Sequence, residues 1–202
     1  MFDINSSDMP KIVDHELYRK ELLRKSFDLF ASKGYAAITM REIAQGLNVS
    51  TGTLYHYFPS KKELFMHLVE EITEENLSIA SAELEGLETL EERLETIGKF
   101  LEKYEDVFIK QSFVMMDFYK HQDAKDMLES DMMRELEKRL EEVFKKCLGF
   151  YDPLLACFVD RFIDGLVMGK IWCNNIDFVE QLKLLGKMIR LYIDHEGIKS
   201  KY

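Results

Sequence analysis

Hydrophobic and polar residues alternate along most of the chain with the period of an α-helix. Near the N-terminus, Leu23, Phe27 and Phe30 are spaced four and then three residues apart, which places them on one helical face. Asp14 precedes this segment as a candidate N-cap, and Gly34 follows it, where a left-handed C-cap favours glycine. The pattern therefore predicts a first amphipathic helix between Asp14 and Gly34.

Two short helices are predicted next. Thr39 and Glu42 have the spacing of a capping box, so a helix starts after Thr39. Its inner face consists of Ile43, Ala44 and Leu47. After a tight turn, Ser50 or Thr51 caps a second short helix, which extends to about Phe58. These two helices lie close together in sequence, so they form a helix-turn-helix.

A long helix begins at the second capping-box pattern, formed by Ser60 and Glu63, and ends near Gly86. The pattern remains helical after this glycine. A single apolar seam is formed by Leu87, Leu90, Leu94, Ile97 and Leu101. Further helices are predicted over about 104–121, 124–148, 153–173 and 177–195, and the last has a stripe of Phe178, Leu182, Leu185, Ile189 and Tyr192.

The composition supports an all-α fold. Glycine (10) and proline (3) are scarce in a chain of 202 residues, whereas an all-β chain needs these residues at its many turns. No run of 18 apolar residues is present, and the N-terminus lacks a signal-peptide core. Three cysteines without CxxC spacing argue against a disulfide framework, so we expect a cytoplasmic protein.

The charge is distributed unevenly along the chain. The formal net charge is −10, but residues 1–65 contain 9 Lys and Arg and 8 Asp and Glu, a net of +1. The acidic excess, a net of −11, therefore lies in residues 66–202. Such asymmetry hints at separate tasks for the two parts, although an acidic helical surface is more often only a solvated face.

The helix-turn-helix contains the residue types that read DNA. The first short helix would support the second, and the second would enter a major groove about 12 Å wide. The candidate reading face consists of Thr51, Gly52, Thr53, Tyr55, His56 and Tyr57. Lys61 and Lys62 follow at a helix start, where side chains and backbone N–H groups can meet phosphate.

Residues 15–66 resemble the N-terminal domain of the TetR family of bacterial transcription regulators. The matching motifs occur in order: LFxxxGY, TxREIA, the turn with Val49 and Ser50, GTLYxYF and SKxEL. The resemblance implies phosphate contact by Thr39, base or phosphate contact by Arg41, and phosphate contact by Lys61. It implies base-facing roles for Thr51, Gly52, Thr53 and His56, and phosphate or sugar contacts by Tyr55 and Tyr57. Met40 departs from a polar residue common in some members.

The expected organisation is a tail over 1–13, a three-helix DNA-binding domain over 14–59, a connecting helix over 60–86, and an effector-binding and dimerisation domain over 87–202. The apolar, Met-rich segment near 104–119 is either ordinary core or part of a ligand cavity. The candidate ligand residues are Phe113, Met116, Tyr119, Met168 and Trp172.

The last two helices are expected to form the dimer interface, unless they merely complete the core of a monomer. The candidate interface residues are Phe158, Phe162, Gly165, Gly169, Leu182, Leu185 and Ile189. A helix that is apolar nearly all round must be buried on both sides, and two glycines four residues apart permit close helix approach.

No enzyme motif is present in the sequence. The five histidines lack metal-ligand spacing, and no GxGxxG, Walker or GxSxG sequence occurs, so no metal or cofactor is predicted. We expect a homodimeric repressor that binds a two-fold operator in double-stranded DNA and is released by a small apolar or amphipathic ligand. The alternatives are a regulator without an effector, an activator, or a helical carrier that does not bind DNA.

Overall fold

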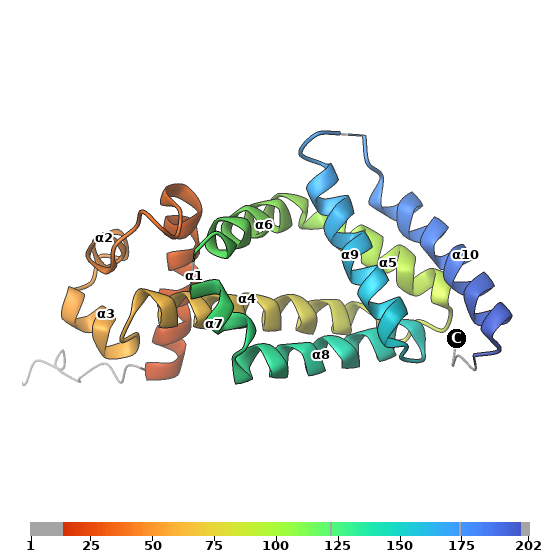
Figure 1. Cartoon of the computed structure of the whole chain (residues 1–202), viewed down its shortest axis with the longest axis horizontal. Coiled ribbons are helices and arrows are strands. Elements are labelled where there is room, and N and C mark those ends of the chain that lie inside the picture. Colours follow the sequence, from red (N-terminus) through yellow and green to blue (C-terminus); the bar gives the residue numbers. More distant parts are fainter. Residues whose placement is uncertain (1–13, 122, 174, 199–202) are drawn as a thin grey trace, which may run out of the picture.

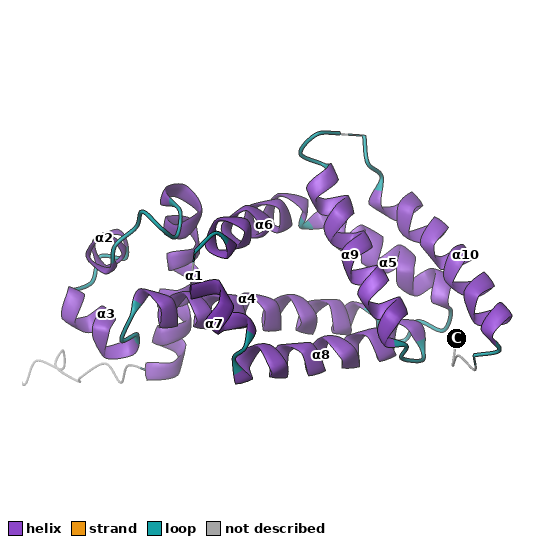
Figure 2. Cartoon of the chain, in the orientation of Figure 1, coloured by secondary structure: helices purple, strands orange, loops and turns teal. Residues whose placement is uncertain are grey.

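The computed structural model describes residues 14–121, 123–173 and 175–198, and every regular element within these ranges is a helix (Figures 1 and 2). The helices are α1 His15–Lys33, α2 Met40–Gly46, α3 Thr51–Tyr57, α4 Lys61–Glu83, α5 Leu90–Lys103, α6 Glu105–Tyr119, α7 Asp123–Leu128, α8 Asp131–Leu148, α9 Pro153–Gly169 and α10 Phe178–Glu196. The expected N-terminal tail, residues 1–13, lies outside the described residues.

The starts of the first helices are fixed by local caps, as predicted. The Asp14 side chain accepts hydrogen bonds from two backbone N–H groups of α1, and Thr39 and Glu42 form a reciprocal capping box at α2. Ser50 caps α3 by accepting from the backbone N–H of Thr53. The second predicted capping box is only half formed, because Ser60 accepts from the Glu63 N–H without a return bond among the described residues.

Two predicted helices have different ends in the structure. The segment over 124–148 is not continuous, because the Ser130 hydroxyl donates to the Met127 carbonyl and accepts from the Met133 N–H, which separates α7 from α8. The helix over 153–173 stops at Gly169. The interruption lets α7 pack against the N-terminal helices while α8 runs along α4 (Figure 1).

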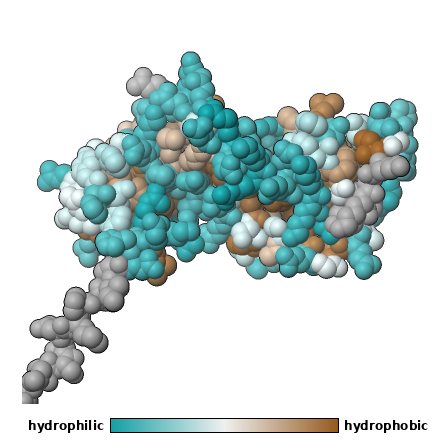
Figure 3. Space-filling model, turned by 90° about the horizontal axis from the view of Figure 1, so that it is seen from below, coloured by the Kyte–Doolittle hydropathy of each residue, from teal (hydrophilic) through white to brown (hydrophobic). Residues whose placement is uncertain are grey.

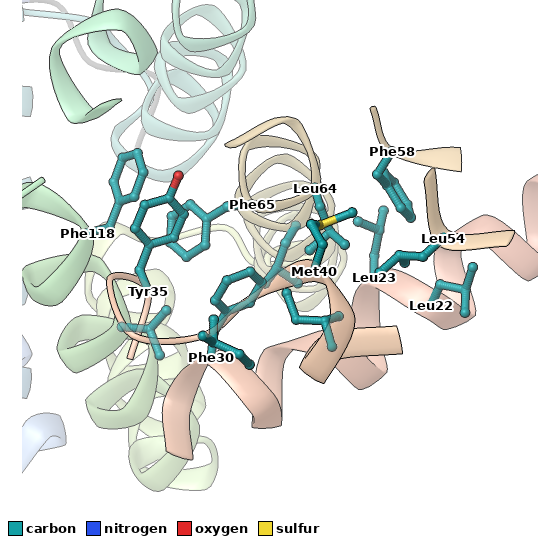
Figure 4. Close-up of a cluster of buried hydrophobic side chains, with 14 of the residues drawn as sticks. Leu22, Leu23, Phe30, Tyr35, Met40, Leu54, Phe58, Leu64, Phe65 and Phe118 are labelled. Atoms are coloured by element: carbon teal, nitrogen blue, oxygen red, sulfur yellow. The ribbon is translucent and has the colours of Figure 1, made fainter. Parts of the chain in front are cut away.

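The buried residues form two hydrophobic cores, one at each end of the molecule. The N-terminal core joins α1 to α4 with parts of α6 and α7, and its aromatic members include Tyr35, Phe65 and Phe118 (Figure 4). The Phe65 and Phe118 rings stack with their centroids 4.4 Å apart. The C-terminal core joins the end of α4 to α5, α8, α9 and α10. The long helix α4 spans both parts, so it and α6 connect the two cores (Figure 1).

The expected dimer stripe of α10 is wrong in its helical phase. Leu182, Leu185 and Ile189 are buried inside the single chain, because α10 packs along α5. A Cβ on Gly98 of α5 would lie 2.8 Å from the Val179 Cα, which shows how close the two helices are. Gly169 also faces inward, since a Cβ there would lie 2.7 Å from Ile176 Cδ1.

A different set of side chains forms the exposed apolar face of the last two helices. It consists of Leu154, Phe158, Leu184, Met188 and Leu191. Of the other expected residues, Phe162 is half-buried, and Gly165 is exposed, so that a Cβ added to it would point into open space. A groove of about 390 Å³ runs between Leu154 and Phe158 of α9 and Met188 of α10. In Figure 3, hydrophobic patches interrupt the mainly hydrophilic surface of this half of the molecule.

Candidate nucleic-acid interface and ligand cavity

The helix-turn-helix is anchored on one face and open on the other. Leu54 on the inner face of α3 and Phe58, the residue that follows its last turn, are fully buried in the N-terminal core. The turn between α2 and α3 closes through Asn48, which has a φ of 56°, and the Val49 N–H donates to the Ala44 carbonyl at 2.9 Å. Thr51, Gly52, Tyr55 and His56 are left on the exposed face. Short polar and aromatic side chains therefore lie on a rigid, solvent-facing edge.

The residues at the start of α2 are also divided between an exposed face and the buried core. Thr39 is exposed, and its hydroxyl donates to Glu42 Oε2 at 2.8 Å while capping the helix. Arg41 is exposed and makes no hydrogen bond or ion pair with any residue that the structure describes. Met40 is buried in the core, so its departure from the family pattern reflects packing. Glu42 pairs with Lys33, and this pair together with Thr39 lowers the pKa of Glu42 to about 2.

The two tyrosines of α3 have different environments. Tyr55 projects from the exposed face, whereas Tyr57 is half-buried. The Tyr57 hydroxyl shares a hydrogen bond of 2.9 Å with His15 Nδ1, and its ring packs edge-on against Tyr18 at 5.6 Å. Tyr57 therefore braces α3 against α1. Thr53, also half-buried, shares a hydroxyl hydrogen bond of 2.8 Å with the Ser50 cap.

The expected outward role of the Lys61 side chain is corrected by its contacts. Its Nζ donates to the carbonyls of Tyr35 at 2.7 Å and Ile38 at 2.9 Å, and it lies 4.7 Å from the Tyr35 ring centroid. Burial lowers the pKa of Lys61. The ammonium therefore ties the start of α4 to the loop after α1, and only the backbone N–H groups at this helix start remain as candidate phosphate donors. The neighbouring Lys62 pairs with Asp126 of α7 at 2.5 Å.

The same loop is bonded to α6 and α7. The Tyr35 backbone N–H donates to Asp117 Oδ2, and the Tyr35 hydroxyl donates to Asp123 Oδ2, both at 2.7 Å. Burial, followed by the bond to Asp123, raises the pKa of Tyr35. Asp123 also lies 3.1 Å from His121 Nδ1. These contacts join the N-terminal helices α1, α2 and α3, called the reading head below, to α6 and α7.

A cavity of about 560 Å³ lies between α4, α5, α6, α8 and α9. Three of the five predicted ligand residues, Met116, Tyr119 and Met168, line it. Most of the other lining residues are aliphatic or aromatic, and they include Leu94, Phe100, Phe108, Met115, Leu140 and Phe144. A volume in this range is typical of sites for small organic molecules.

The other two predicted ligand residues, Phe113 and Trp172, do not line this cavity. Phe113 is 50% exposed on another face of α6, where it lines a separate pocket beside α1. At 100° per residue it is turned well away from Ser112, Met115 and Tyr119, which mark the cavity face. Trp172 is 80% exposed. Its predicted position on the cavity face assumed a helix that continues to residue 173, but α9 ends at Gly169.

Sequence reasoning missed the polar lining of the cavity. Asn76 of α4 donates to Gln111 of α6 at 3.1 Å, and Asp160 and Asp164 line the wall formed by α9. Cys147 is buried at the wall, and burial raises the pKa of its thiol to about 12. No local signal distinguishes these residues, because acidic and amide side chains on amphipathic helices ordinarily face solvent.

The described residues offer neither a metal site nor a membrane-spanning helix. They contain no group of three His, Cys, Asp or Glu side chains placed to hold a metal ion. Each described helix is either too short or too polar to span a bilayer.

The fold and its two sites define a helix-turn-helix protein with an all-helical, cavity-containing second part. Residues 22–68 match the sequence model of the bacterial regulatory proteins of the tetR family. The chain is 35% identical over 77 residues to the HTH-type transcriptional repressor Rv1474c of Mycobacterium tuberculosis, a match over 37% of this chain and 41% of that relative. It is 26% identical over 199 residues, 89% of each chain, to the probable acrEF/envCD operon repressor of Escherichia coli.

A solved structure extends the likeness to the whole fold. The transcriptional regulator FadR from Bacillus subtilis, in complex with stearoyl-CoA, superposes with a TM-score of 0.65 at 16% identity, covering 84% of this chain and 96% of that one. The N-terminal part of this chain is therefore similar to the bacterial regulatory proteins of the tetR family, and the chain as a whole shares the helical fold of FadR.

Proposed function

We propose that the protein is a transcription repressor that binds operator DNA through α3 and releases it when a small ligand occupies the cavity. The observation that carries this proposal is the exposed polar edge of α3 on a fully buried support. The relatives named as transcriptional repressors share this part of the chain, and their similarity supports the same role here.

Within the reading head, the candidate contact residues divide into two roles. Thr51, Gly52, Thr53 and His56 are the proposed base-reading set, because short side chains let a helix approach base edges in the major groove. Thr39, Arg41 and Tyr55 are the proposed phosphate contacts. Of these, Arg41 has a full charge that no described residue neutralises, so it is the strongest electrostatic contributor in the set.

A homodimer would supply the second reading head. Pairing the exposed apolar face of α9 and α10, defined above, would be favourable, since each buried Å² of apolar surface contributes about 25 cal/mol. A two-fold pairing of this face would place two copies of α3 on the same side of DNA, and a two-fold operator matches such symmetry. Gly165 lies on this side and would allow close helix approach.

The ligand effect is proposed to travel through α6 as well as α4. Ser112, Met115 and Met116 of α6 line the cavity, and the next residue, Asp117, holds the Tyr35 backbone. A ligand can change DNA affinity only if it binds the two conformations differently. A small shift of α6 would move the loop after α1, and with it the reading head.

The test is a mobility-shift titration against DNA from upstream of the gene and against sites selected from random oligonucleotides. Arg41→Ala should weaken binding to all sequences and reduce the salt slope by about 0.9 for one lost phosphate contact. His56→Ala should instead change the preferred bases. Absence of any selected site, with the protein folded and dimeric, would favour the alternative of a helical carrier. Selected sites that activate transcription would favour an activator.

A further inference from the structure

The charged side chains of the cavity wall bear on the class of ligand, provided that the cavity is the effector site of the proposed function. Asp160 and Asp164 lie four residues apart on α9, so they share one face of that helix and both line the cavity. Arg161 lies beside them, 3.3 Å from Asp160 Oδ2 and 2.9 Å from Asp164 Oδ2.

The charge of the lining is unbalanced. Asp160, Arg161 and Asp164 are its charged residues, which gives two carboxylates and one guanidinium, and the rest of the lining is neutral. The Arg161 and Asp164 side chains are 71% and 61% exposed, whereas the Asp160 side chain is only 31% exposed. The guanidinium is therefore largely hydrated, and the less hydrated charge at the wall is negative.

Asp160 has an environment that favours neutralisation. Burial, and then the nearby Asp164 carboxylate, raise the pKa of Asp160, which shows that its negative charge is incompletely compensated. A bound cation would compensate the negative charge of Asp160, because opposite charges in a partly desolvated site attract each other more strongly than in water. An anionic head group would meet the two carboxylates, and the guanidinium is already paired with both.

The remaining lining suits the same kind of ligand. Tyr119 is half-exposed near the carboxylates, and Phe100, Phe108 and Phe144 contribute further rings to the wall. Aromatic faces attract cations, and methionine side chains adapt to irregular apolar bodies. Met115, Met116 and Met168 supply this adaptable surface.

We propose that the cavity binds a lipophilic cation, a molecule with an apolar body and one positive charge that lies against Asp160 and Asp164.

A matched pair of probes separates charge from shape. Tetraphenylphosphonium and tetraphenylborate have nearly the same size and apolar surface but opposite charge. Calorimetric titration of the full chain should give tetraphenylphosphonium an affinity at least about tenfold higher. Asp160→Asn and Asp164→Asn should each weaken the cation by about tenfold and leave tetraphenylborate unchanged or tighter. Glu137→Gln, which removes one exposed negative charge from α8, should leave both affinities unchanged.

Equal binding of the two ions, tighter binding of tetraphenylborate, failure of both to bind, or unchanged cation affinity in both Asn variants would overturn the proposal. Thermal unfolding of the variants near the parent temperature establishes that any loss is local. Operator affinity, measured on the same samples, separates this inference from the proposed function. Binding of the cation without any change in DNA affinity would leave the ligand class intact and overturn the proposed effector role.

Discussion

The hydrogen bond between Tyr35 and Asp123 provides a sharp test of how the reading head is attached. Tyr35→Phe removes only the hydroxyl, and the ring keeps its packing among Phe30, Phe65 and Phe118. The bond is 2.7 Å long, its donor residue is 1% exposed, and its acceptor is a carboxylate. Only one oxygen atom is removed, so the loss measures mainly the polar contact.

The expected loss follows from the environment of the two groups. A hydrogen bond to a charged partner contributes about 1.5–3 kcal/mol. The Asp123 side chain is 25% exposed, so water partly replaces the lost donor, and we expect a decrease of about 1–2 kcal/mol in the free energy of unfolding. In a chain of this size, 1 kcal/mol corresponds to roughly 2–4 °C in Tm. The expected decrease in Tm is therefore about 2–8 °C.

The assay is chemical and thermal unfolding at pH 7, with a double-mutant cycle that adds Asp123→Ala, which removes the acceptor. The pKa of Tyr35 is raised in the folded chain. Its contribution is therefore fully present below the unfolded value of about 10 and is lost only as the pH rises through the higher folded value. Tyr104→Phe is the matched control, because its hydroxyl makes no hydrogen bond to a described residue.

Two results would refute this reasoning. One is an unchanged Tm for Tyr35→Phe, and the other is an equal loss in the presence and absence of Asp123→Ala. If the α6 and α7 contacts transmit the ligand signal, Tyr35→Phe should also reduce the factor by which a bound ligand weakens DNA binding.

Three further predictions concern pH, thiol reactivity and assembly. The folded pKa of Glu42 is lowered to about 2, so the advantage of the parent over Glu42→Gln should be present above about pH 4.5 and diminish as the pH falls toward 2; a constant difference would contradict the cap geometry. Cys147 should resist a thiol reagent at pH 8 until the chain unfolds, while the two exposed cysteines react at once; rapid reaction of all three in the folded protein would exclude a buried Cys147. Met188→Glu should give monomers by light scattering and Leu17→Glu, at an exposed apolar position on α1, should not; dimers of normal mass for Met188→Glu would show that the exposed face is not the interface.

The sequence by itself determined where the N-terminal helices start and which of their faces are buried. A cap bonds to a backbone N–H within three residues, so Asp14, Thr39 and Ser50 express their effect through local geometry alone. The inner faces of these short helices follow from the helical period, and Leu54 and Phe58 are buried as that period requires. The helices of the reading head could therefore be predicted from residues that are close together in the chain.

Only the tertiary structure decided between choices that the local pattern leaves equal. Helix α10 has two apolar stripes, and packing along α5 determines that Leu185 is buried while Met188 is exposed. Lys61 lies at a helix start that suits phosphate, but the loop from α1 brings three backbone carbonyls within 3.4 Å of its ammonium. The cavity likewise joins Asp160 to helices distant in sequence. Such contacts depend on how the helices are placed in space, and the period of a single helix does not contain that information.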